Sequence, residues 1–190
     1  MNVLYQEFPE YLEIDGEKYP IETDFREWIR FSALVEDEEI SWITKIQLMM
    51  QWFLEKIPDD LEAAIYAMGD FLTAKRLYRD DPEENLNKER DLKPAFSFEE
   101  DAGCIYSAFV ECYGIDLQTV HYMHWWKFKT LFDWLPEETE IKQRIKYRTT
   151  DTNTIKDPEE RKRVRRIQEA IALRKKKRIL DDYEIGDVFA

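Results

Sequence analysis

The stretch of sequence that predicts the fold most directly is LQTVHYMHWWKF, residues 117–128. Its apolar and imidazole side chains recur every three or four residues, the spacing that places them on one face of an α-helix. Continued past residue 128, this pattern predicts a helix from about Asp116 to Pro136. The predicted inward face consists of Leu117, His121, His124, Phe128, Leu131 and Leu135.

Large aromatic residues occupy the other faces of this predicted helix. A helix with aromatic residues all round is either buried on most sides in its own core or offers part of its surface to a partner. Both readings remain open, and since Trp and Tyr dominate interface energetics, these residues are candidates for partner binding. They are Tyr122, Trp125, Trp126 and Trp134.

The two histidines invite a metal-site hypothesis, because His121 and His124 fall on the same predicted face. Cys104 or Cys112 from the preceding helix could complete such a site. The spacing is not H-E-x-x-H, however, and seven residues between the cysteines do not fit a zinc knuckle. A simpler interpretation is that both histidines line the core and have ordinary hydrogen-bond partners, so we expect no metal.

Further helices are predicted on both sides of this segment. Helical periodicity and end signals predict one after an Asp24–Glu27 capping box, with Phe25, Trp28, Ile29, Ser32 and Val35 on one face. A Ser97–Glu100 capping box opens another, with Phe98, Ala102, Ile105, Phe109 and Cys112 inward and Gly114 at its end. The remaining predicted helices are Ser41–Ile57 (inward Ile43, Ile46, Met50, Leu54 and Ile57), Leu61 to about Tyr78 (Leu61, Ile65, Met68 and Leu72), and Pro136 to about Tyr147.

The N-terminal region predicts a β-hairpin. Strand-like segments at 11–14 and 18–21 flank Asp15-Gly16-Glu17, and Asp-Gly tolerates the positive φ angles of tight hairpin turns. Pro20 cannot donate to a strand partner, which predicts an edge strand. Residues 79–94 are polar and predict a long loop. The expected fold is therefore mainly α, a bundle of about six or seven helices with a small N-terminal β-hairpin.

Composition and motifs exclude several classes of protein. The 190 residues are 44% hydrophobic and carry a net charge of −13, which suits a folded domain and argues against a protein that coats DNA. No apolar run is long enough to span a membrane, and the start of the chain lacks a signal-peptide pattern. No glycine-rich phosphate loop, G-x-S-x-G motif or distinctive pair of carboxylates is present, so we expect no catalytic residue and no cofactor.

The C-terminal segment differs in charge from the rest. Residues 149–154 are linker-like, and Asp157-Pro158-Glu159-Glu160 predicts the start of a helix that reaches about Leu180. Residues 156–178 hold 11 Lys or Arg against 4 Asp or Glu, a balance of +7 that leaves −20 for the remainder. The sequence thus predicts an acidic helical domain, 1–150, and a basic helix and tail, 151–190. Candidate partner-binding residues here are Arg161, Arg165 and Arg166.

Two uses of this basic segment are open. It could bind nucleic acid, although the −20 remainder opposes phosphate contacts. It could instead attract the acidic body of the same or a neighbouring copy, which predicts self-association.

In order along the chain, four groups of residues resemble the bacteriophage gene product fifteen family of siphophages and prophages of Gram-positive bacteria. The resemblance covers about residues 11–150, and the HWWKF block is its most specific part. The groups are EIDG (13–16), YPI (19–21) and TDFR (23–26); FEED (98–101), IY (105–106) and YGIDL (113–117); HWWKF (124–128); and IKYR (145–148).

This resemblance implies a non-enzymatic tail assembly chaperone. Such a protein binds the tape measure protein, recruits tail-tube subunits in the host cytoplasm, and is absent from the mature virion. The alternatives are a structural tail component, a nucleic-acid-binding protein acting through residues 156–178, or a metal-dependent enzyme using His121 and His124.

Overall fold

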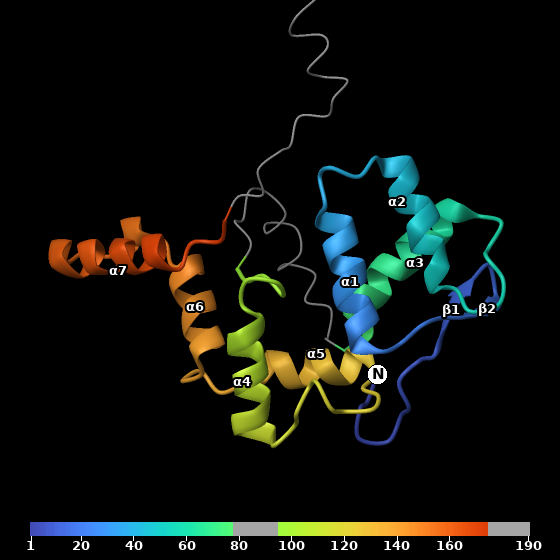
Figure 1. Ribbon diagram of the computed structural model, residues 1–190, viewed down its shortest axis with the longest axis horizontal. Helices are drawn as coiled ribbons and strands as arrows, with labels where there is room; N and C mark the ends of the chain where they lie inside the picture. The colour runs from blue at the N-terminus through green and yellow to red at the C-terminus, as the bar shows by residue number, and fades with distance from the viewer. Residues whose placement is uncertain (78–94, 175–190) are drawn as a thin grey trace, which may run out of the picture. The chain divides into compact units, whose positions relative to one another are not determined.

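The computed structural model describes residues 1–77 and 95–174. Within these residues it confirms a mainly α-helical fold with a small N-terminal hairpin (Figure 1). The elements are β1 (Tyr11–Ile14), β2 (Glu17–Pro20), α1 (Phe25–Glu36), α2 (Trp42–Met49), η1 (Met50–Trp52), α3 (Leu61–Thr73), η2 (Lys75–Leu77), α4 (Ala102–Tyr113), α5 (Trp125–Asp133), α6 (Glu140–Thr149), η3 (Thr152–Thr154) and α7 (Pro158–Ala170), where η marks a short 3-10 helix.

The described chain divides into two compact units. Residues Pro9–Thr73 form the hairpin unit, whereas Met1–Phe8 and the described residues between Ala74 and Leu173 form the α5 unit. The division predicted at residue 150 lies inside the α5 unit, between α6 and η3. The loop predicted at 79–94 lies outside the described residues.

The hairpin forms where the sequence predicts it. Asp15 and Gly16 have φ angles of 53° and 79°, so both adopt the left-handed conformation of a two-residue type I′ turn. The antiparallel register pairs Leu12 with Tyr19 and Ile14 with Glu17. Leu12, Ile14 and Tyr19 are buried, and β1 packs against α3 within the same unit.

Helix α1 begins at the predicted residue but with a different cap. The Asp24 side chain accepts a hydrogen bond from the Arg26 backbone N–H at 2.9 Å, while Glu27 forms an ion pair with Arg30 instead of completing a capping box. The predicted inward position of Val35 is wrong, because its side chain is exposed. The buried face is Phe25, Trp28 and Phe31.

The predicted Ser41–Ile57 helix is wrong in its second half. Ser41 caps α2 by accepting the Thr44 N–H, but α2 ends at Met49, and after η1 the chain becomes extended at Phe53. Phe53 pairs with Ile21, and the Leu54 N–H donates to the Pro20 carbonyl at 3.0 Å. Pairing with the end of β2 therefore takes the place of the second half of the predicted helix. The residues Ile43, Leu54 and Ile57, which we expected to face inward, are exposed.

Helix α3 is shorter than predicted. Asp60 caps it by accepting the Ala63 N–H at 2.9 Å, and Ala64, Met68 and Phe71 are buried. Leu61 is exposed instead of inward. The helix ends at Thr73 because Ala74 adopts a left-handed φ of 54°. The predicted end near Tyr78 lies outside the described residues.

In the α5 unit, helix α4 starts later than predicted and ends at the predicted residue. Ser97 accepts the Glu99 and Glu100 N–H groups, but α4 begins later, at Ala102, whose side chain is exposed instead of inward. Gly114 ends α4 with a φ of 63°, as predicted. Figure 1 shows α4 and α6 side by side, with α7 turning away from the end of α6.

Helix α7 begins as the sequence predicts. Pro158 is its first residue and Asp157 caps it by accepting the Glu159 N–H at 3.0 Å. The helix ends at Ala170, about ten residues before the predicted end, and residues 175–180 lie outside the described chain.

Candidate interaction surfaces

Helix α5 starts nine residues later than predicted, and a histidine is the reason. His124 Nδ1 accepts the Trp126 backbone N–H at 3.0 Å, so this imidazole is the N-cap of α5. Asp116 accepts the Gln118 N–H at 2.8 Å and starts only a single turn. The predicted helix from Asp116 is therefore wrong before residue 125.

The later start separates the two histidines. His124 is buried and stacks on the Phe8 ring with a centroid distance of 4.9 Å, whereas His121 is exposed. The prediction that both occupy one inward helical face is therefore wrong. Among the described residues, no group of three His, Cys, Asp or Glu side chains could hold a metal ion. Cys104 and Cys112 are free thiols.

Two of the four aromatic candidates are buried. Trp125 stacks on Phe128 at 5.7 Å, and Trp126, with 2% of its surface exposed, packs edge-on against Phe8 at 6.4 Å. Phe98 also contacts the Trp125 ring, with centroids 6.1 Å apart. Burial of this kind stabilises the fold and leaves little of either indole for a partner.

The other two aromatic candidates are exposed and lie at opposite ends of α5. Trp134, the C-cap residue, has 78% of its surface exposed, and Tyr122 precedes the N-cap with about half of its surface exposed. An exposed indole of this size is a candidate anchor for a partner.

A second apolar surface was not predicted. At the N-terminal segment of the α5 unit, the Gln6 N–H donates to the Asn2 carbonyl and the Leu4 N–H to Asn2 Oδ1, which closes a turn. Leu4, 88% exposed, and Tyr5 project from this turn. The sequence signal was the apolar run Val3-Leu4-Tyr5, which matches no helical or strand period.

A buried ion pair stabilises the α5 unit, which carries these exposed side chains. Asp101, whose side chain is fully buried, accepts two hydrogen bonds from Arg148, at 2.6 and 3.0 Å, and one from Arg144 at 3.2 Å. The Ser97 N–H donates a fourth at 3.0 Å. Burial alone would raise the pKa of Asp101, but the hydrogen bonds from Arg148, Ser97 and Arg144 outweigh it and lower the pKa.

Arg148 also connects three segments of the α5 unit. Its Nη1 donates to the Ala95 carbonyl at 3.2 Å, and its Nε donates to the Ile171 carbonyl at 2.8 Å. The pair with Asp101 therefore holds the residues before α4 and the end of α7 against α6. Neither this arginine nor Asp101 was a predicted site residue, because 69 of the 190 side chains are charged and the sequence does not show which are buried.

The predicted arginines of α7 have different surroundings. Arg161 donates through Nε and Nη2 to the Ile155 carbonyl, at 3.0 and 2.6 Å, so it supports the turn that contains η3. Arg165 donates to Thr152 Oγ1 at 3.3 Å. Arg166 is exposed and has no hydrogen-bond or ion-pair partner among the described residues. Of the three, Arg166 is the one best placed to meet a partner.

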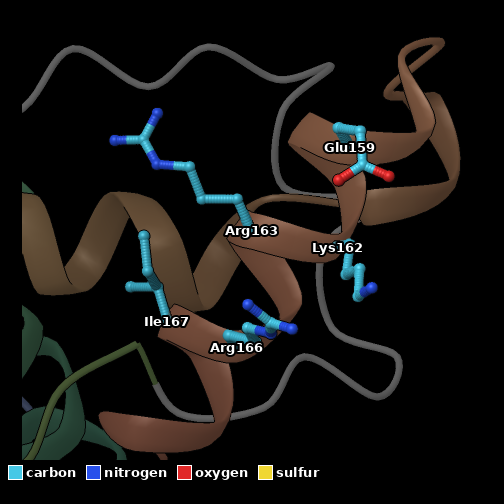
Figure 2. A pocket seen from close by; sticks show the side chains of 5 residues that line it. All are labelled: Glu159, Lys162, Arg163, Arg166 and Ile167. Atoms are coloured by element: carbon cyan, nitrogen blue, oxygen red, sulfur yellow. The ribbon is translucent and has the colours of Figure 1, made fainter.

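Arg166 lies in a shallow hollow on the outer face of α7, which Figure 2 shows from close by. The lining residues share one face because they are spaced by three and four along the helix. Three cationic side chains dominate it, and Ile167 supplies an apolar wall. The lining residues are Glu159, Lys162, Arg163, Arg166 and Ile167, of which Arg166 alone was a predicted partner-binding residue.

Comparisons with known proteins give one match. The family model described as Bacteriophage Gp15 protein matches residues 4–173, which is most of the chain. No curated protein and no solved structure gives a significant match. No helix among the described residues is both long and apolar enough to cross a membrane. The match includes the hairpin, all seven described α-helices and the HWWKF block, and it confirms the resemblance. The chain therefore belongs to the bacteriophage Gp15 protein family, and this membership indicates a phage structural or morphogenesis protein.

Proposed function

We propose that this protein is a non-enzymatic tail assembly chaperone, which binds the tape measure protein in the host cytoplasm and recruits tail-tube subunits. Family membership over residues 4–173 is the observation that carries the proposal. The protein would leave before the virion matures. The proposed role is one of binding, and it assigns no catalytic step to the chain.

The exposed apolar side chains of the α5 unit support a binding role. Trp134, Leu4 and Tyr5 are large, exposed and held by a cap or a turn, so a partner would meet them without much ordering cost. A tape measure protein with long amphipathic helices would offer apolar stripes for such anchors. The net charge of −13 would keep the resulting complex soluble.

The test is co-expression with the tape measure protein of the same phage, followed by pull-down and measurement of the soluble fraction. We expect the tape measure protein to be soluble only with this chain, and Trp134→Ala, or Leu4→Ser with Tyr5→Ser, to reduce capture. Tyr66→Ala is the matched control, because Tyr66 is an equally exposed aromatic residue on α3 in the hairpin unit.

Two results would contradict the proposal. One is a tape measure protein that is equally soluble without this chain. The other is mass spectrometry of purified virions that finds this chain at the abundance of tail subunits, which would favour the structural tail component instead.

A further inference from the structure

The outer face of α7 is exposed, whereas its inner face is fixed by burial and hydrogen bonds. Val164 is buried, and Gln168 donates to the Tyr147 and Thr150 carbonyls, each at 2.8 Å. On the outer face, Lys162 and Arg166 have no ion-pair partner among the described residues. Arg163 pairs with Glu160 at 3.3 Å, but the two side chains are 65% and 45% exposed, so this pair is weak. The hollow is thus a cationic surface with an apolar wall, on a helix whose inner face is held in place.

An acidic and apolar surface of matching character lies in the hairpin unit. The connector from α1 to α2 contains three consecutive carboxylates, 37–39, which follow Glu36 at the end of α1, and Trp42 and Ile43 come next at the start of α2. Ile43 is 72% exposed and Trp42 is more than half exposed. Among the described residues, Glu38 and Glu39 have no side-chain hydrogen-bond partner.

This connector has a fixed shape. The buried Lys45 extends its Nζ to the Val35 carbonyl at the end of α1, a bond of 2.7 Å that ties α2 to α1. Asp37 accepts the Glu39 N–H at 2.8 Å, and Ser41 caps α2. A surface that is already ordered loses less entropy on binding.

We propose that the hollow on α7 binds the acidic connector and Trp42 of a second copy of this chain. The carboxylates of the connector would meet Lys162, Arg163 and Arg166, and the Trp42 indole would pack against Ile167. The two surfaces differ, so the contact is head-to-tail, and each copy offers one of each. Such a contact generates a ring or an open chain of subunits.

Charge and surface chemistry favour a second copy over nucleic acid as the occupant. A phosphate backbone could pair with the three cations, but it would meet a chain with a net charge of −13 and leave Trp42 and Ile43 without a role. A second copy would cover both. At physiological ionic strength, charges beyond about 8 Å are screened, so the local pairing outweighs repulsion between the acidic bodies.

The test uses the purified full-length chain alone, so its outcome is independent of the proposed function. Sedimentation equilibrium over a range of concentrations measures self-association of the wild type, of Arg163→Glu with Arg166→Glu, and of Glu38→Lys with Glu39→Lys. We expect each double reversal to weaken association roughly tenfold or more. The charge-matched controls are Lys127→Glu with Lys146→Glu and Glu137→Lys with Glu138→Lys, all at exposed positions, which leave association unchanged.

Mixing the two reversed variants gives the decisive measurement. In the mixture, the acidic α7 of one variant meets the basic connector of the other, and the unchanged α7 and connector can form the original contact. The mixture therefore associates, although each variant alone associates at least tenfold more weakly than the wild type. Lys162→Gln with Arg166→Gln, which removes charge without reversing it, gives a smaller loss and covers the case of a misfolded reversal.

Three results would overturn the proposal. They are a wild type that is monomeric at every concentration, a mixture that stays monomeric, and reversals of α7 that abolish binding to DNA or RNA while self-association is unchanged.

Discussion

Removing the Arg148 side chain is expected to destabilise the α5 unit more than any other single charge removal there. Arg148→Met keeps most of the aliphatic stem but deletes two hydrogen bonds to the fully buried Asp101 and two to backbone carbonyls. Breaking a buried ion pair from one side costs about 3–5 kcal/mol, because the remaining charge is uncompensated. Arg144 still donates to Asp101 at 3.2 Å, so we expect about 3–4 kcal/mol.

Urea denaturation followed by tryptophan fluorescence measures this loss, and an unchanged denaturant slope would show that the folded state is still compact. The control is Arg144→Met, whose side chain is 29% exposed and makes one long bond to Asp101, and we expect it to cost about 0.5–1 kcal/mol. Equal costs for the two variants would refute the reasoning, because they would mean that the bidentate pair of Arg148 contributes no more than the single, partly exposed contact of Arg144.

A double-mutant cycle separates the pair from its surroundings. Asp101→Asn alone leaves the mostly buried Arg148 charge without its carboxylate, whereas Asp101→Asn with Arg148→Met leaves no buried charge. We expect the double variant to cost at least 1 kcal/mol less than the sum of the single variants. If the losses of the two single variants simply add, the loss of unfolding free energy comes from packing and not from the ion pair.

Lowering the pH is expected to remove the stabilisation that the ion pair of Asp101 and Arg148 contributes. In the folded chain, the pKa of Asp101 lies below its ordinary value of 3.8. The stability that the carboxylate confers is therefore complete above 3.8 and is lost as the pH falls through the lower folded pKa. The difference in unfolding free energy between wild type and Asp101→Asn should accordingly shrink below about pH 4. Gly114→Ala is expected to cost about 1 kcal/mol of unfolding free energy, because its φ is 63°, whereas Gly69→Ala, inside α3 with open space for a Cβ, should gain about 0.5–1 kcal/mol in the same urea assay. Trp126→Ala is expected to cost about 3–5 kcal/mol, but Trp134→Ala less than about 0.5 kcal/mol, since only the first is buried, and thermal unfolding of the pair measures the contrast.

Local chemistry made several elements predictable. The Asp15-Gly16 turn, the helix start near Ser41 and the Asp157-Pro158 helix start depend on residues close in sequence, and all three appear as expected. Gly114 also ends its helix in the expected conformation. Each of these signals acts within one turn of the chain, so no knowledge of the tertiary fold was needed.

Other predictions failed where distant contacts decide the structure. Helical periodicity continued to Ile57, but pairing of Phe53 with Ile21, 32 positions earlier, takes the chain out of the helix. The helix predicted from Asp116 begins only after His124, and histidine is an unusual N-cap. An error in where a helix starts changes which aromatic residues face inward, so the sequence could not separate Trp126 from Trp134.

The pairing at the end of β2 has a consequence for how this chain behaves in a crowded assembly. An exposed strand edge can add a strand from another protein and so begin aggregation. Here Pro20 has no N–H to offer, its carbonyl is taken by Leu54, and the Glu22 N–H is taken by the Trp52 carbonyl. The outer edge of the hairpin is therefore closed where β2 ends. In the proposed chaperone role, the chain would thus offer an aggregation-prone partner no backbone template where β2 ends.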